Sequence, residues 1–463
     1  MNGSDLTQTP HGAVLAYDRG SLVLSGPARK EGVPAYLVWD ERVGAWRGLA
    51  SHYRALVRWL ARGGVAVDDR ARDYPELALE PPHLPTPYPH QAEALTAWSR
   101  GKRGIVELPT GSGKTQLALQ AIAEVHRGTL VLVPTLDLLA QWCGAIERAL
   151  GVPAGAIGGG QDDLRPITVC TYASAYRRGE QFGQRFCLAI FDECHHMAAP
   201  GYARIGEVLI APYRLGLSAT VERADEGHRA LEPLIGPIVY RRSIGELSGD
   251  YLADYRVETI EAELSAAERE AHDAAREAYR TFAREHGLTP TSAAGWQRFV
   301  FAASRTAEGR AALAAYYRQR QISFAPESKF AALAHLLRRH REERVLVFTN
   351  DNRTAYEVAR RFLLPIITHQ TRTAERRTIL ARFREGAWPF LVTSRVLNEG
   401  VDVPAANIAV ILSGTASVRE HVQRLGRILR RAPGKEAVLY EVLSRTTGEA
   451  YVSQRRRQHD AYR

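Results

Sequence analysis

The stretch VELPTGSGKTQLALQAIAEV, Val106 to Val125, decides the fold of the chain around it. A short apolar run leads into a glycine-rich turn, and apolar side chains then recur on one face of a helix. Gly111 and Gly113 let the backbone bend around a phosphate, which the N–H groups at the start of the helix would face. Lys114 adds a positive charge for the outer phosphates, and the Thr115 hydroxyl can reach Mg²⁺. The stretch therefore predicts a phosphate-binding P-loop, formed by Thr110, Gly111, Ser112, Gly113, Lys114 and Thr115.

An acidic pair, Asp192 and Glu193, ends a second apolar run, FCLAIFDE. A loop that binds ATP needs an acid at the end of another strand. Asp192 would hold Mg²⁺ through water, and Glu193 would polarise the attacking water as a general base. The strict P-loop pattern has glycine where this chain has Leu108, but the rest of the motif is intact. The two motifs together predict a P-loop NTPase that uses ATP and Mg²⁺, with Thr115 and Asp192 on the metal side.

The cysteine and two histidines that follow this acidic pair suggest a zinc site as an alternative. Structural zinc sites space their ligands so that the side chains converge on one point. Cys194, His195 and His196 are consecutive, and consecutive side chains of an extended segment alternate between faces. No second cluster of cysteine and histidine occurs in the chain. We therefore favour the phosphate interpretation over the metal one.

Strand and helix patterns alternate on both sides of these motifs, which predicts an α/β protein with two tandem RecA-like P-loop NTPase domains. The first, residues 81–242, contains further strands that end in the hydroxyls of Thr135, Thr171, Ser218 and Thr220. The second, residues 243–463, has candidate strands at 345–351, 365–371, 390–404, 408–414 and 437–444. It has no glycine-rich phosphate loop.

Two further modules are predicted. Residues 1–80 form a small α+β domain, with an amphipathic helix in SHYRALVRWLARGG and aromatic side chains (Tyr36, Trp39 and Trp46) that we expect in its core. A proline-rich linker, 75–90, follows. Residues 264–325 form a helical insertion in the second domain, opened by a capping box at Ser265 and Glu268. Its arginine-rich face favours contact with DNA over a purely structural role; the residues are Arg298, Arg305, Arg310, Arg318 and Arg320.

Composition narrows the choice of partners. The formal net charge is +10, and residues 419–463 alone hold 11 Lys and Arg against 5 Asp and Glu. A basic surface suits either a polyanionic partner or plain solvation. No run of about 18 apolar residues occurs, so we expect no membrane span. The N-terminus is polar and the four cysteines form no CxxC pair, which favours a reducing, cytoplasmic setting without a signal peptide.

The ordered set TGSGKT, DECH, SAT, VLNEGVDVP and QRLGRILR resembles the motifs of superfamily-two helicases. The stretches QRLGRILRRAPGKEAVLYEVLSRTTGE, LIGPIVYRRSIGELSGDYLADY and AYDRGSLVLSG are similar to the XPB family, above all to its short archaeal form. This resemblance covers nearly the whole chain. It implies that residues 1–80 are a damage-recognition domain and that residues 264–325 are a thumb that grips DNA.

The resemblance also implies roles for single residues. Asp192 to His195 would be a DExH box, in which His195, with Ser218 and Thr220, couples ATP state to the other motifs. Gln91 would read adenine, although Tyr88 stands where the family has arginine. Contacts to nucleotide are implied for Gly400 and Asp402, a position beside the γ-phosphate for Gln423, and arginine-finger roles for Arg427 and Arg430. Contacts to DNA are implied for Thr135, Thr171, Thr368, His369, Arg223 and Asp225. The family's Arg-Glu-Asp triplet here reads Arg223-Ala224-Asp225.

The function expected from this resemblance is an ATP-dependent DNA helicase or translocase that moves 3′ to 5′ and takes part in DNA repair. Its partners would be single-stranded, forked or damaged DNA and a nuclease, and the protein would be a monomer. Three alternatives stay open. One is a double-stranded DNA translocase that does not separate strands, another is a DNA-binding scaffold switched by ATP that recruits a nuclease, and the third is an RNA substrate.

Overall fold

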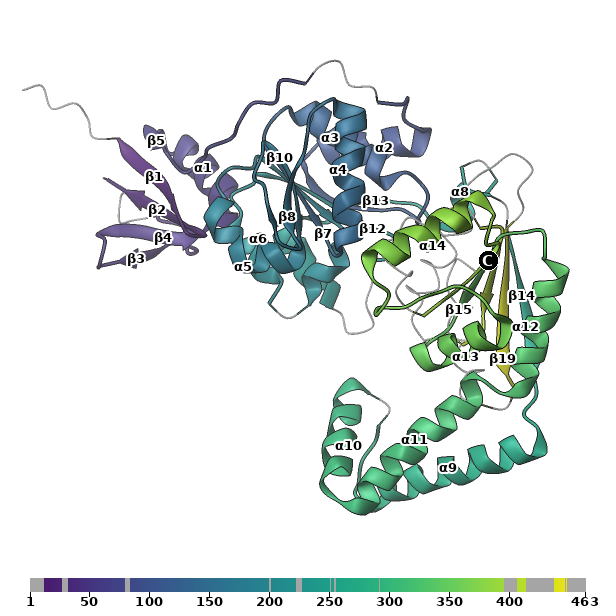
Figure 1. Ribbon diagram of the computed structural model, residues 1–463. Coiled ribbons are helices and arrows are strands. Elements are labelled where there is room, and N and C mark those ends of the chain that lie inside the picture. The colour runs from purple at the N-terminus through teal and green to yellow at the C-terminus, as the bar shows by residue number, and fades with distance from the viewer. Residues whose placement is uncertain are drawn as a thin grey trace, which may run out of the picture. The chain divides into compact units, whose positions relative to one another are not determined.

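The computed structural model describes residues 12–26, 32–79, 84–199, 201–221, 227–249, 251–253, 255–290, 292–394, 406–413, 437–445 and 447. The chain divides into two compact units, Met1–Arg242 and Ser243–Arg463 (Figure 1). Over the described ranges, none of the helices combines the length and apolar character that crossing a bilayer requires. The predicted fold class is confirmed, because both units are built on largely parallel α/β sheets and the chain starts with a small α+β domain.

The N-terminal domain is a five-stranded sheet in the order β3-β4-β2-β1-β5, packed against one helix. Its strands are β1 (Ala13–Asp18), β2 (Ser21–Ser25), β3 (Val38–Asp40), β4 (Ala45–Leu49) and β5 (Val67–Asp69). A short 3-10 turn, η1 (Ala50–His52), leads into helix α1 (Tyr53–Arg62). The predicted amphipathic helix is confirmed, since Tyr53, Leu56 and Leu60 of α1 enter the domain core.

The expectation that the aromatic side chains of this domain are core residues is wrong for Trp39. Its side chain is 44% exposed, and Tyr36 and Trp46 are only half-buried. Trp39 lies on β3, an edge strand, and packs edge-on against Trp46 with 5.4 Å between the ring centroids. Within the run PAYLVWDER, only Val38–Asp40 form a strand, which is β3.

The first RecA-like sheet has eight strands in the order β13-β6-β12-β11-β7-β10-β8-β9, and only β8 and β9 pair antiparallel. The strands are β6 (Arg103–Glu107), β7 (Thr129–Val133), β8 (Gly155–Gly158), β9 (Gln161–Asp162), β10 (Ile167–Thr171), β11 (Leu188–Asp192), β12 (Tyr213–Ser218) and β13 (Ile238–Arg241). The helices are α2 (Pro89–Ser99), α3 (Lys114–Val125), α4 (Leu136–Leu150), α5 (Tyr172–Phe182), α6 (Ala203–Val208) and α7 (Leu231–Leu234), with 3-10 turns η2 (Cys194–Ala198) and η3 (Gly227–Ala230). Helix α3 packs with α4, and α5 packs with α6 (Figure 1). The parallel registers bring the ends of β6, β12, β11, β7 and β10 to one edge of the sheet.

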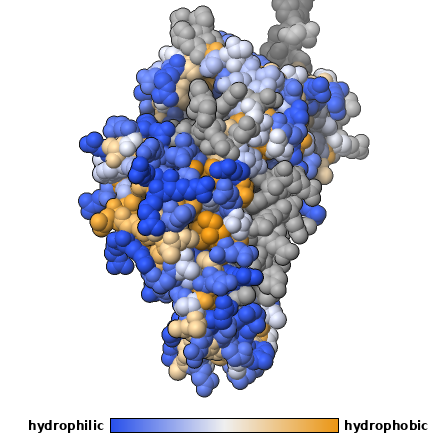
Figure 2. Space-filling view, turned by 90° about the vertical axis from the view of Figure 1, so that its right-hand side faces the viewer, coloured by the Kyte–Doolittle hydropathy of each residue, from blue (hydrophilic) through white to orange (hydrophobic). Residues whose placement is uncertain are grey.

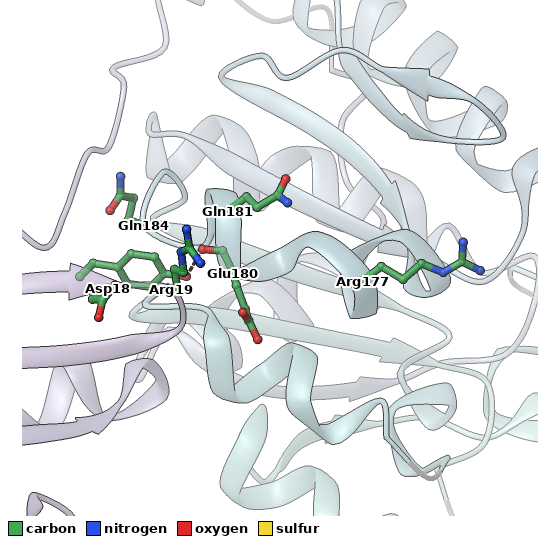
Figure 3. Close-up of a pocket in the computed structure, with 7 residues that line it drawn as sticks. Asp18, Arg19, Arg177, Glu180, Gln181 and Gln184 are labelled. Carbon is green, nitrogen blue, oxygen red and sulfur yellow. Dashed lines mark hydrogen bonds between the residues drawn. The ribbon is translucent and has the colours of Figure 1, made fainter.

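The N-terminal domain contacts α5 and α6 of this RecA-like domain through the end of β1 and the turn that leads to β2. The Tyr17 hydroxyl lies 3.1 Å from the carbonyl oxygen of Glu180 and 3.0 Å from that of Val208. The fit is close, since a Cβ on Gly20 would approach Val208 to 2.8 Å and Gly20 has a φ of +89°. A polar hollow of about 470 Å³ beside this contact is lined from the turn and from α5, and Arg177 points away from the other lining residues (Figure 3).

The proline-rich segment 75–90 is not a free linker along its described length. Pro75 accepts a hydrogen bond from the N–H of Gly128, and Glu76 forms an isolated bridge and an ion pair with Arg127. Helix α2 begins within the segment, at Pro89. Proline at the first position of a helix costs nothing because that N–H has no partner within the helix.

The second unit contains a six-stranded parallel sheet in the order β14-β19-β18-β15-β17-β16. The strands are β14 (Tyr255–Ala262), β15 (Val345–Phe348), β16 (Ile366–Ile367), β17 (Phe390–Thr393), β18 (Ile408–Ile411) and β19 (Ala437–Ser444), and the helices outside the insertion are α8 (Ile244–Leu247), α12 (Glu327–Arg339), α13 (Asn352–Phe362) and α14 (Thr373–Glu385). Each of the five predicted ranges contains a strand, although β16 covers only Ile366–Ile367 and the later part of the range 390–404 lies outside the described residues. Sequence analysis missed β14, an edge strand that pairs along its whole length with β19.

The helical insertion consists of α9 (Ala266–Glu285), α10 (Ala293–Arg305) and α11 (Ala307–Phe324). The predicted capping box at Ser265 and Glu268 is confirmed by reciprocal hydrogen bonds. The three helices enclose a core of their own, which includes Phe282 and Phe299. Four of the five arginines named above are exposed, and the fifth, Arg320, packs against the Tyr316 ring. Figure 2 shows a mostly hydrophilic face with separate apolar areas.

Candidate active site

The P-loop lies between the end of β6 and the start of α3. Gly111 and Gly113 have φ angles of +91° and +86°, in the left-handed region that favours glycine. Only glycine fits at Gly113, because a Cβ there would lie 2.0 Å from the Gln91 amide nitrogen. The Lys114 ammonium folds back and donates to the Leu108 carbonyl oxygen at 3.1 Å. Thr115, the first-turn hydroxyl of α3, is exposed.

Gln91 is fully buried beside this loop. Its amide nitrogen donates to the carbonyl oxygen of Ser112 at 3.0 Å, and its amide oxygen accepts from the N–H of Tyr88 at 3.0 Å. His90 contacts the same Ser112 carbonyl through Nε2 at 2.9 Å. In this structure Gln91 therefore joins the start of α2 to the P-loop, which is a contact that the sequence did not predict.

Asp192 ends β11 and is 6% exposed. Its Oδ2 accepts a hydrogen bond from the Trp142 indole at 2.8 Å, and its Oδ1 accepts from the N–H of Glu193 at 3.1 Å. Burial, and then the charge of Glu193, raise the pKa of Asp192 to about 6, while the Trp142 hydrogen bond and the charge of Lys114 oppose this rise. The carboxyl group is thus ionised near neutral pH, and the Lys114 charge acts on it.

Glu193 adopts a left-handed conformation, with φ of +48°. A residue with a Cβ pays about 1–2 kcal/mol for this conformation, and such outliers gather at functional sites. Its Oε2 has no hydrogen-bond partner among the described residues and lies 3.5 Å from His195 Nδ1. The same His195 nitrogen is 3.2 Å from the hydroxyl of Ser218, which donates to the Thr220 carbonyl oxygen at 2.8 Å. The geometry places these four predicted residues in one chain of contacts.

The donors at this edge fit a nucleotide phosphate with a divalent cation. Buried oxygens of Thr110, Glu193 and Thr220 have no hydrogen-bond partner within the described ranges. Buried polar atoms without partners are uncommon in folded proteins, and those in a site are often satisfied by a ligand or an ion. Carboxylate and hydroxyl oxygens are also the ligands that Mg²⁺ accepts. The residues present therefore match ATP with Mg²⁺.

The predicted contacts to DNA divide into two groups. Thr135 and Thr171 follow β7 and β10, and each caps a helix by accepting a backbone N–H at 3.2 Å. In the second unit His369 is exposed and contacts Asn352, but Thr368 is fully buried and its hydroxyl lies 3.2 Å from that of Tyr356. The Thr368 side chain is therefore not presented to a ligand in this structure.

Several predicted site residues lie outside the described residues. They are Arg223, Asp225, Gly400, Asp402, Gln423, Arg427 and Arg430. The residues considered for zinc are described, and the His195 and His196 rings lie 4.5 Å apart, but the part of the chain that the structure describes contains no group of three or more side chains able to hold a metal ion. Cys194 is buried in the hydrophobic core, whereas His196 stacks on Tyr172. All four cysteines are free thiols.

Sequence analysis missed two residues that touch Asp192. Trp142 donates to its carboxylate, and the Tyr172 hydroxyl donates to its backbone carbonyl oxygen at 2.9 Å. Both rings are almost fully buried. The available signal was their position, since each lies in a helix that is capped by a threonine and follows a strand of this sheet.

A P-loop, an acidic strand end and a second parallel α/β unit define a helicase-type P-loop ATPase. Residues 84–223 match the family model of the type III restriction enzyme res subunit, residues 328–432 that of the helicase conserved C-terminal domain, and residues 15–71 that of the xeroderma pigmentosum group B helicase damage recognition domain. The DNA 3′-5′ translocase XPB2 of Sulfurisphaera tokodaii is 39% identical over 91% of this chain and 96% of its own length. The chain belongs to the XPB family of helicases.

Other relatives are more distant. The DNA 3′-5′ helicase XPB of Mycobacterium tuberculosis is 31% identical over 80% of this chain, and the match spans 62% of that protein. Among solved structures, the Hef helicase domain of Pyrococcus furiosus has a TM-score of 0.51 with 19% identity, covering 79% of this chain and 98% of that one. This structural likeness supports the fold alone.

Proposed function

We propose that this chain is an ATP-dependent DNA translocase and helicase that moves 3′ to 5′ and serves DNA repair. The observation that carries the proposal is the site in the first unit, where Lys114 lies in the P-loop, Trp142 holds the Asp192 carboxylate, and Glu193 keeps a carboxylate oxygen without a hydrogen-bond partner among the described residues. The relatives named DNA 3′-5′ translocase and DNA 3′-5′ helicase support DNA as the track and 3′ to 5′ as the direction.

The chemistry of each side chain indicates its proposed role in binding or hydrolysing ATP. Lys114 leaves the Leu108 carbonyl and holds the outer phosphates, while the Gly111 and Gly113 backbone wraps them. Thr115 and Asp192 would hold Mg²⁺, which neutralises charge on the phosphates when bound. Glu193 accepts the proton of the attacking water. His195, with Ser218 and Thr220, would pass the state of the site to the end of β12.

Roles outside the described residues rest on the sequence resemblance. Arg427 and Arg430 are proposed as arginine fingers, and Gln423, Gly400 and Asp402 as nucleotide contacts. Gln91 is described, and its proposed contact to adenine also rests on the resemblance. Arg223 and Asp225 are proposed to part the strands. A nuclease partner, a monomeric state and a cytoplasmic setting are proposals of the same kind, as are the domain boundaries at residues 80 and 242.

Whether the protein separates DNA strands or only moves along them is tested by comparing two substrates at equal ATP turnover. A helicase releases the shorter strand of a 3′-tailed duplex, whereas a translocase that leaves strands paired releases only the third strand of a DNA triplex. We expect both signals. Triplex release without strand separation would favour the double-stranded translocase, and DNA-independent, slow ATP turnover without either signal would favour a switched scaffold.

The arginines of the helical insertion should contribute to DNA affinity through phosphates. Replacing Arg298, Arg305 and Arg310 together with alanine should lower the slope of log K against log salt by about 0.7–0.9 for each arginine that pairs with a phosphate. Fluorescence anisotropy of labelled single-stranded DNA at several salt concentrations measures this slope. The matched control replaces three exposed arginines of the same unit: Arg338, Arg339 and Arg341. Equal slopes for both triple variants would show that the insertion is structural.

A further inference from the structure

Two buried aromatic side chains donate hydrogen bonds to Asp192, one to its carboxylate and one to its backbone carbonyl oxygen. Trp142 of α4 donates its indole N–H to Oδ2 at 2.8 Å, and Tyr172 of α5 donates its hydroxyl to the backbone oxygen at 2.9 Å. The two rings are 2% and 1% exposed, respectively. An indole is a hydrogen-bond donor only, so it fixes the carboxylate as an acceptor in one orientation. Because neither ring has room to turn, a shift of either helix changes its hydrogen bond to Asp192.

Each of these helices starts at a threonine on the same edge of the sheet. Thr135 caps α4 by accepting from the N–H of Leu138, and Thr171 caps α5 by accepting from the N–H of Ser174. Thr171 is the last residue of β10, and Thr135 lies two residues after the neighbouring parallel strand β7, whose last residue, Val133, pairs with Thr171. The N-terminus of a helix presents N–H groups that favour an anion such as a DNA phosphate. Helix α4 therefore links the proposed DNA contact at Thr135 to Trp142, and in α5 the proposed contact at Thr171 directly precedes Tyr172.

We propose that Trp142 and Tyr172 are positioning residues that couple the binding of a DNA strand at Thr135 and Thr171 to the orientation of Asp192, and so to the binding of nucleotide with Mg²⁺. The proposal rests on the proposed function. A DNA phosphate that fixes the start of α4 would also fix Trp142 further along that helix, and one that fixes the start of α5 would fix Tyr172, its first residue. By linkage, the bound nucleotide must then change the affinity for DNA by the same factor. Partners of a metal-ligating carboxylate commonly change metal affinity about 10–100-fold.

The test uses binding to the full chain rather than turnover. The affinity for a fluorescent, non-hydrolysable ATP analogue is measured with Mg²⁺, in the presence and absence of single-stranded oligothymidylate. We expect DNA to change this affinity at least about 5-fold in the wild type, which is a common size for coupled sites. In Trp142→Phe and in Tyr172→Phe, DNA should change the affinity for the analogue by less than about 2-fold. Trp142→Phe should also need about 10-fold more Mg²⁺ for half-maximal binding.

Trp98→Phe is the matched control. It removes an indole N–H that donates to the Arg214 carbonyl oxygen at 2.9 Å, from a ring of the same domain that is 1% exposed. This variant should lose thermal stability as the other two do, yet keep the wild-type coupling factor. If both phenylalanine variants at 142 and 172 keep the wild-type factor, or if Trp98→Phe loses it as well, the inference is overturned. A wild type whose analogue binding ignores DNA would overturn the proposed function itself.

Discussion

Glu193→Gln should stop ATP turnover while leaving the affinity for nucleotide nearly unchanged. Glutamine has the size of glutamate, but its amide cannot take the proton of the attacking water. A general base contributes about 10²–10⁴ to the rate, so turnover with saturating DNA should fall by about that factor. The structural basis is Oε2, which lies 3.5 Å from His195 Nδ1 but makes no hydrogen bond to any described residue that the substitution would break. Phosphate release and equilibrium binding of a fluorescent ATP analogue measure the two halves of the prediction.

The unfolding temperature of Glu193→Gln distinguishes a loss of catalysis from misfolding of the variant. The charge of Glu193 helps to raise the pKa of Asp192, so the two carboxylates repel one another. Neutralising Glu193 removes that repulsion, and the variant should unfold at a temperature no lower than the wild type. Glu124→Gln is the matched control, since Glu124 pairs with Lys102 at the surface. Glu193→Gln turnover within about 3-fold of the wild type would contradict the assignment of the general base.

Lys114→Ala should abolish turnover by a different route, through the loss of nucleotide binding as well as of rate. The ammonium is the fixed cation that the outer phosphates meet, and removing one preorganised donor from such a site costs about 10²–10³ in rate. Among the described residues, the hydrogen bond of this side chain is to the Leu108 backbone carbonyl, at 3.1 Å, so its loss should have little effect on folding. Analogue binding, phosphate release and thermal unfolding together give the expected pattern.

Lys102→Ala provides the comparison for this variant. Lys102 lies in the same domain and forms an ion pair with Glu124, away from the P-loop. It should leave turnover and nucleotide binding as in the wild type. Wild-type analogue affinity in Lys114→Ala would show that the phosphates are held elsewhere.

Short sequence patterns predicted the parts of the fold that are determined by residues close together in the chain. The P-loop was predictable because Gly111 and Gly113 must adopt left-handed backbone, and the insertion because Ser265 and Glu268 form a capping box within one turn. Strands such as β15, with four buried residues, read as apolar runs. The edge strand β14 was missed because its side chains are mixed in burial and character.

Contacts between distant residues were not predictable from pattern. Trp142 and Asp192 are 50 positions apart, and nothing in either segment indicates the other. The attachment of the N-terminal domain depends on Tyr17 meeting two carbonyl oxygens far along the chain. Gln91 was expected at the adenine, but its hydrogen bonds to the P-loop are set by the close approach of α2 to Gly113. These contacts arise from tertiary packing, which one sequence does not encode in any local signal.

The most direct test of the central claim follows movement along DNA. Streptavidin is bound to biotin at either the 5′ or the 3′ end of a single-stranded oligonucleotide, and its release is measured with ATP. A 3′ to 5′ translocase should free streptavidin from the 5′ end and leave it at the 3′ end, and Glu193→Gln should free neither. Release from the 3′ end, or equal release from both ends, would contradict the account.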